Sequence, residues 1–125
     1  MDYERSFLLT NIGDYFLKVN QPDSAILYFK KTLVISESHE DLKGLAISIG
    51  NIGLAYHQKK DFKIAVKYFK KSLTIAHKNS FNKVIYDNYK DLSKTYQMMG
   101  DYKRSLSYYS QYLKTPSLVQ KQKKK

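Results

Sequence analysis

The chain has 125 residues, of which 22 are basic and 11 acidic, for a formal net charge of +11. It contains no cysteine, so disulfides and thiol chemistry are excluded. Its apolar runs are far shorter than the ~20 residues of a transmembrane helix, and no basic-then-apolar signal sequence opens it, which favours a cytoplasmic location.

Apolar residues recur at helical spacing in six successive segments, which predicts an all-α chain. Pro22 is placed to begin the second helix, because proline is tolerated in the first helical turn. Asp61 and Asp101 stand where N-caps of the fourth and sixth helices belong. The expected helices span residues 3–19, 22–37, 42–59, 62–78, 81–99 and 102–114.

The helical pattern repeats with a period of 40 residues. The segment that begins at Asn11 as Asn-Ile-Gly returns at Asn51, and a weaker copy, Asp-Leu-Ser, begins at Asp91. A fixed period of this length indicates stacked supersecondary units rather than one globular fold. We therefore expect one array over residues 1–114, with units at 3–41, 42–80 and 81–114, followed by a basic and disordered tail at 115–125.

Each unit resembles the tetratricopeptide repeat (TPR), here in a variant with a 40-residue period. The resemblance rests on a small residue and an aromatic residue on each helix of the unit. In this sequence they stand as Ile12-Gly13, Phe16, Ala25 and Phe29, then Ile52-Gly53, Tyr56, Ala65 and Phe69, and in a degraded copy as Leu92-Ser93, Tyr96, Ser105 and Tyr109. It implies a right-handed α-solenoid of three helix-turn-helix hairpins that acts as a non-catalytic scaffold for a protein or peptide partner.

Catalytic chemistry has little support in the sequence. The three histidines are scattered, no metal-ligand spacing occurs, and no glycine-rich loop could hold a phosphate, so we expect no enzyme activity, metal or cofactor. Asp87 and Asp91 share a helical face, but Lys90 and Lys94 lie beside them, which favours a solvated ion-pair face over an acid pair.

In TPR arrays the first helix of each unit lines a concave surface that holds the partner. The resemblance therefore implies a groove site made of Asn11, Asp14, Asn51, Leu54, His57, Lys90, Lys94 and Gln97. The amide of Asn51 can donate and accept at once, which suits pairing with a peptide backbone, but it could equally bond a neighbouring helix or simply tolerate exposure. For Asn11, at the array end, the structural interpretation is favoured.

One TPR subfamily, which clamps the C-terminal carboxylate of chaperones, is disfavoured by the sequence. The positions that correspond to the clamp are Thr10, Asp14, Asn51, Asp87 and Asp91, and only Asn51 matches. Asp87 and Asp91 stand where cations are needed to hold an anion.

Lysines form a second candidate surface. Lys63, Lys67, Lys70 and Lys71 follow helical spacing on a second helix, which would face the convex side of the array. Together with the basic tail, they leave open an alternative function as an electrostatic binder of nucleic acid or an anionic surface, although a solvated face is the favoured interpretation. A further alternative is a sensory or oligomerisation segment of a larger bacterial signalling protein.

The third unit differs where a following helix would pack. Units one and two place Thr32 and Ser72 at a position that the third fills with the bulky Tyr112. This predicts an array end, and it leaves open a homodimer through the last helix. By contrast, Tyr28, Tyr68 and Tyr108 recur at the repeat period, which indicates packing rather than stacking on bases.

Overall fold

A computed structural model describes residues 2–115 and confirms the all-α architecture. The six helices are α1 (Asp2–Lys18), α2 (Pro22–Ser38), α3 (Leu42–Gln58), α4 (Phe62–Asn79), α5 (Asn82–Met98) and α6 (Tyr102–Lys114). Each bound lies within one residue of its expected place. The predicted disordered tail, apart from Thr115, lies outside the described residues.

The turns explain the period. Each of the first five helices is followed by one residue in the left-handed region, and these residues recur every 20 positions: Asn20, Glu40, Lys60, Ser80 and Gly100. A unit of two helices and two turns therefore occupies 40 residues. Only Gly100 is a glycine. The side chains at the other four positions carry the cost of a left-handed conformation, roughly 1 kcal/mol each.

The helix starts follow the expected chemistry with one exception. Pro22 lies in the first turn of α2, as predicted. Asp101 caps α6, because its carboxylate accepts a hydrogen bond from the Arg104 backbone N–H at 3.1 Å. Asp61 occupies the N-cap position of α4, but its side chain makes no capping hydrogen bond.

Glycine and phenylalanine join the two helices of each of the first two hairpins. Gly13 faces the ring of Phe29, and Gly53 faces the ring of Phe69; both rings are fully buried. A small residue here lets the helix axes approach closely. In the third unit a hydrogen bond takes the place of this contact: the Ser93 hydroxyl donates to the Ser105 carbonyl at 2.9 Å.

A second aromatic contact recurs in all three units. One ring from the first helix stacks on a tyrosine of the second helix, with centroids 5.5–5.6 Å apart: Phe16 on Tyr28, Tyr56 on Tyr68, and Tyr96 on Tyr108. The periodic tyrosines are therefore packing residues, as their spacing predicted.

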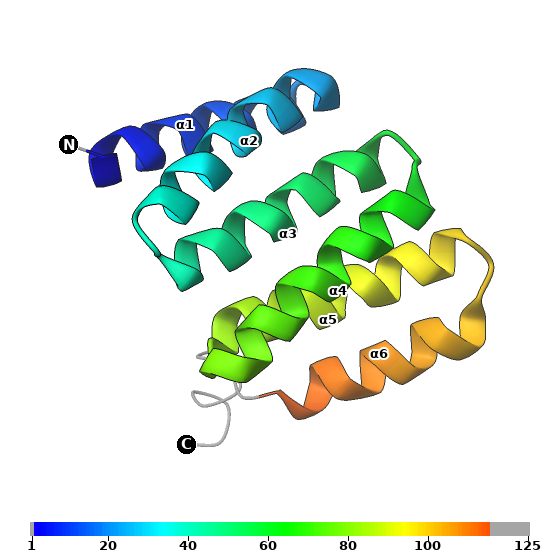
Figure 1. Cartoon of the computed structure of the whole chain (residues 1–125). Helices are drawn as coiled ribbons and strands as arrows, with labels where there is room; N and C mark the ends of the chain where they lie inside the picture. Colours follow the sequence, from blue (N-terminus) through cyan, green and yellow to red (C-terminus); the bar gives the residue numbers. More distant parts are fainter. Residues whose placement is uncertain (1, 116–125) are drawn as a thin grey trace, which may run out of the picture.

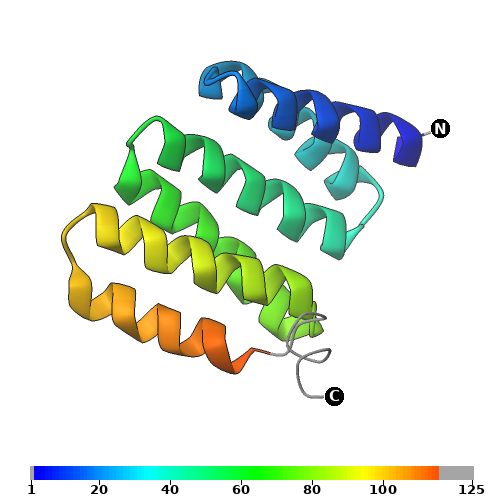
Figure 2. The same ribbon diagram turned by 180° about the vertical axis from the view of Figure 1, so that it is seen from behind.

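The array curves with its first helices on the inside. α1 contacts α3 and α3 contacts α5, whereas α2, α4 and α6 make no direct contact with one another within residues 2–115. α2 and α4 lie nearer the viewer in Figure 1, and α1, α3 and α5 lie nearer in Figure 2, which shows the inner face.

Hydroxyl groups join one unit to the next. The Thr32 and Ser48 hydroxyls lie 2.8 Å apart, and Asn88 Nδ2 donates to Ser72 Oγ at 2.8 Å; all four residues are buried. These contacts require small residues on α2 and α4. At the equivalent position of α6, Tyr112 instead packs against Tyr86 of α5, with the two hydroxyl oxygens 2.7 Å apart.

The described part of the chain ends on an apolar surface. α6 has no buried residue, and its large apolar side chains Tyr102, Leu106, Tyr109 and Leu113 are all exposed. Tyr112 packs back on Tyr86 of its own unit, and the array end stays a prediction. The homodimer through this helix stays a prediction.

Candidate functional site

A cavity of about 250 Å³ opens between α3 and α5 on the inner face. α3 contributes one wall, α5 contributes the other, and Ser72 reaches the floor from α4. The lining residues are Ala46, Ile47, Gly50, Asn51, Leu54, Ser72, Val84, Asp87, Asn88, Lys90 and Asp91.

Three of the predicted groove residues meet at this cavity: Asn51, Leu54 and Lys90. Asn51 is half-buried, and its side chain makes no hydrogen bond to any residue in 2–115. Within the described chain, the alternative that it bonds a neighbouring helix is therefore wrong, whereas simple tolerance of partial exposure stays open. Leu54 is also half-buried and packs at the edge of the core.

The remaining predicted residues of units two and three lie outside the cavity. Lys94 and Gln97 are exposed on α5. His57 joins α3 to α5, because its Nδ1 lies 2.8 Å from Thr95 Oγ1. Thr95 already donates its hydroxyl hydrogen to the Asp91 carbonyl, so His57 Nδ1 must be the donor. Burial lowers the pKa of His57, and the charge of Lys94 lowers it further, so the neutral form of the ring is favoured.

The first unit extends the same face away from the cavity. Asn11 is exposed and Asp14 is half-buried on α1, and neither side chain lines the cavity. Burial raises the pKa of Asp14, and the charge of Lys18 opposes that rise. These two residues can contact a partner only if it extends beyond α3.

The two aspartates of α5 behave differently from one another. Lys83 Nζ lies 2.8 and 2.9 Å from the two carboxylate oxygens of Asp87, so that residue is ion-paired, although with a lysine other than the expected two. Asp91 is half-buried at the cavity and forms no ion pair within residues 2–115. The expectation of a solvated ion-pair face is therefore wrong for Asp91.

Burial, with a smaller contribution from the neighbouring Asp87, raises the pKa of Asp91 to about 7 against the opposing charges of Lys90, Lys94 and Lys83. The cavity thus disfavours one more negative charge. This agrees with the sequence argument against a carboxylate clamp.

Asn88 is the cavity residue that the sequence reasoning missed. It is only 2% exposed, and its Nδ2 donates to Ser72 Oγ. Ser72 donates its own hydrogen to the Ala46 carbonyl at 2.6 Å, so Ser72 Oγ can only accept from Asn88. This fixes the amide orientation and leaves Asn88 Oδ1 facing the cavity. A signal was present: Asn88 lies 40 residues after Ser48, the polar partner at the preceding unit junction.

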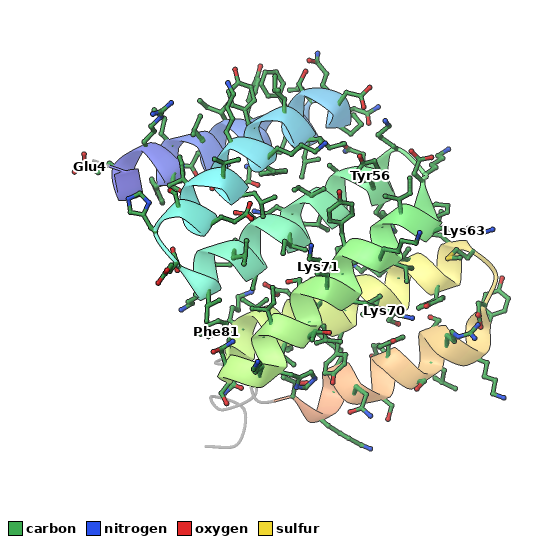
Figure 3. The ribbon with its side chains drawn as sticks, viewed as in Figure 1. Glu4, Tyr56, Lys63, Lys70, Lys71 and Phe81 are labelled. Atoms are coloured by element: carbon green, nitrogen blue, oxygen red, sulfur yellow. The ribbon has the colours of Figure 1, made fainter. Side chains whose placement is uncertain are left out.

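The four predicted convex lysines are all exposed on α4. Figure 3 labels three of them: Lys63, Lys70 and Lys71. Lys70 Nζ lies 5.7 Å from the centroid of the Tyr96 ring, and a hydrogen bond to that tyrosine raises the pKa of Lys70. Lys63, Lys67 and Lys71 form no ion pair in the part of the chain that the structure describes.

Within the described residues, no three His, Cys, Asp or Glu side chains gather closely enough to hold a metal ion. None of the helices in 2–115 combines the length and the apolar character needed to cross a membrane.

Comparison with known proteins agrees with this geometry. The family model "Tetratricopeptide repeat" matches residues 44–115. That match covers more than half of the chain, which therefore belongs to the tetratricopeptide repeat family. No curated protein matches.

Solved structures show the same fold at low sequence identity. The TPR domain of Arabidopsis FLU is similar with a TM-score of 0.83 at 20% identity, over 90% of this chain and 95% of that one. The TPR2AB domain of yeast Sti1, in a complex with pHSP90, gives 0.76 at 22% identity, over 94% of this chain but only 45% of that one. The N-terminal domain of C. elegans STI-1 gives 0.72 at 16% identity, over 99% and 96%.

Proposed function

We propose that this chain is a non-catalytic scaffold that binds a segment of a partner protein in the groove along α1, α3 and α5. The observation that carries this proposal is the cavity between α3 and α5, which is lined by Leu54 and by Asn51. The Asn51 side-chain amide makes no hydrogen bond within residues 2–115. The complex of the Sti1 domain with pHSP90 supports a partner-binding role for a fold of this kind.

The binding mechanism divides between apolar and polar contacts. Leu54 and Ile47 give the segment apolar surface to cover, which supplies most of the affinity. The Asn51 amide donates to and accepts from the backbone of an extended segment, which sets its register.

The test is the affinity of a peptide selected from a random 12-residue display library. We expect Asn51→Ala to weaken that peptide about tenfold, because a buried hydrogen-bonding partner is lost. Asn11→Ala, at the equivalent position of unit one, should have a smaller effect because Asn11 is exposed and away from the cavity. Equal affinity of Asn51→Ala and the unmodified chain would refute the proposal.

A second candidate function is electrostatic binding through α4. It is favoured by Lys63, Lys67 and Lys71, which are exposed and have no ion-pair partner among residues 2–115. Phosphate contacts release counterions, so binding to a single-stranded oligonucleotide would fall steeply between 50 and 200 mM salt, by roughly a factor of 10³ for six contacts. A Lys67→Glu/Lys70→Glu/Lys71→Glu variant would abolish that binding but leave the selected peptide's affinity unchanged.

A further inference from the structure

We propose that the cavity between α3 and α5 is a specificity pocket for one basic side chain, Arg or Lys, carried by the bound segment. This inference rests on the proposed function and names the chemistry that the groove selects. Its acceptors are Asn88 Oδ1 on the floor and the Asp91 carboxylate on the α5 wall.

The floor of the cavity is a fixed hydrogen-bond acceptor. Asn88 Nδ2 donates to Ser72 Oγ, and Ser72 in turn donates to the Ala46 carbonyl. These two hydrogen bonds allow only one orientation of the Asn88 amide. Asn88 Oδ1 has no hydrogen-bond partner within residues 2–115, although the residue is only 2% exposed. Because this oxygen is open to the cavity, a ligand that brings an N–H donor can satisfy it.

Gly50 leaves that acceptor open. A Cβ atom at this position would lie 3.4 Å from Asn88 Oδ1 and 3.4 Å from Ser72 Oγ. The absence of a side chain therefore gives a ligand direct access to the floor. The equivalent positions of the other units are Thr10 and Lys90, so this opening is a feature of unit two.

The charge at the wall favours a cation over a neutral donor. Asp91 lies in the cavity and forms no ion pair within residues 2–115, and Asp87, which also lines the cavity, adds a second negative charge that is paired with Lys83. The charges of Lys90, which lines the cavity too, and of Lys94 oppose this field, and burial lowers the pKa of His57 on α3, which favours its neutral ring. Burial nevertheless outweighs the lysines, so the pKa of Asp91 stays raised. A cation bound beside Asp91 would offset this cost of burying the carboxylate.

The size of the cavity suits one side chain. At about 250 Å³ it is smaller than the ~300–1,000 Å³ of typical small-molecule sites. The net charge of +11 means that non-specific attraction would select acidic peptides. A basic residue shared by the peptides that bind would therefore indicate recognition by the pocket, because the net positive charge of the chain would select against it.

The experiment uses the full chain and the display library in 150 mM salt. We expect the selected peptides to share one Arg or Lys at a fixed position. Replacement of that residue by uncharged citrulline (for Arg) or norleucine (for Lys) should weaken a synthetic peptide about tenfold, and Asp91→Asn should do the same. Because both changes remove one interaction, the combination should cost little more than either alone.

Asp61→Asn is the matched control, because it removes the same charge from an exposed carboxylate that forms no capping bond. It should alter the affinity less than twofold. One contrary result is a peptide that changes the chemical shifts of groove amides and yet keeps its affinity after the neutral replacement. Another is a peptide that changes those shifts and keeps its affinity for Asp91→Asn. Either result would overturn the basic-residue pocket but leave the groove function standing. If no selected peptide shifts groove amides, both the groove function and the pocket are wrong.

Discussion

Two glycines of α3, three residues apart, should respond in opposite ways to the same substitution. A Cβ on Gly53 would lie 2.8 Å from both Cδ1 and Cε1 of Phe69, well inside the ~3.5–4.0 Å of an ordinary carbon contact. The ring is fully buried among Ala65, Val66 and Leu92, so it has little room to move. A Cβ on Gly50 meets only ordinary contacts at 3.4 Å.

The magnitudes follow from two opposing contributions. Alanine in place of glycine stabilises a helix interior by roughly 0.5–1 kcal/mol. Overpacking of a core costs typically about 1–3 kcal/mol. Gly53→Ala should therefore lower the free energy of unfolding by about 1–2 kcal/mol, whereas Gly50→Ala should raise it by about 0.5–1 kcal/mol.

Urea unfolding followed by far-ultraviolet circular dichroism measures both changes. In a Phe69→Leu background the penalty of Gly53→Ala should shrink, because the contacted atoms belong to the phenylalanine ring. Similar destabilisation by both glycine variants, or an unchanged penalty without the ring, would refute the packing argument. Gly50→Ala should also weaken the selected peptide, because the added methyl group takes up cavity space that the ligand would occupy. Since the variant should be more stable, this loss of binding could not reflect misfolding.

Three further predictions follow from the described contacts. Lys60→Gly should raise the free energy of unfolding by roughly 1 kcal/mol, because Lys60 has φ of 68°; no gain in a urea titration would contradict this. Ser72→Ala should lower it by about 1–3 kcal/mol, since it leaves Asn88 Nδ2 buried without an acceptor, and a neutral thermal melt would be the contrary result. The pKa of Asp91, about 7 in the folded chain, lies above its unfolded value of ~3.9, so this carboxyl lowers stability as the pH rises through that interval. Asp91→Asn should thus raise the free energy of unfolding by about 1–2 kcal/mol at pH 8 and have little effect at pH 4, and an equal effect at both pH values would show that the pKa is not raised.

The sequence was sufficient for the fold because the fold depends on periodic residues. Helical spacing located the six helices. The repeat was identified by recurring residues such as Gly53 and Phe69, which are in contact in the structure. The left-handed turns were harder to predict, because Glu40 and Lys60 are not residues that favour that conformation. Their place follows from the equal lengths of the helices rather than from local preference.

The candidate site was predicted only in part. Helical periodicity assigned Asn51, Leu54 and Lys90 to the inner face correctly, since a face is a property of one helix. Asn88 was missed because its role depends on Ser72 of the preceding helix. His57 was assigned to the groove, but its contact with Thr95 was not predicted, because Thr95 lies on another helix. Such pairings between helices require the packed structure.

The central claim, that the groove binds the partner, is tested most directly by amide chemical-shift mapping of the 15N-labelled chain saturated with the selected peptide. We predict the largest shifts at Gly50, Asn51 and Leu54 of α3 and between Asp87 and Asp91 of α5. Shifts confined to α4 around Lys63, Lys67 and Lys71 would contradict the claim.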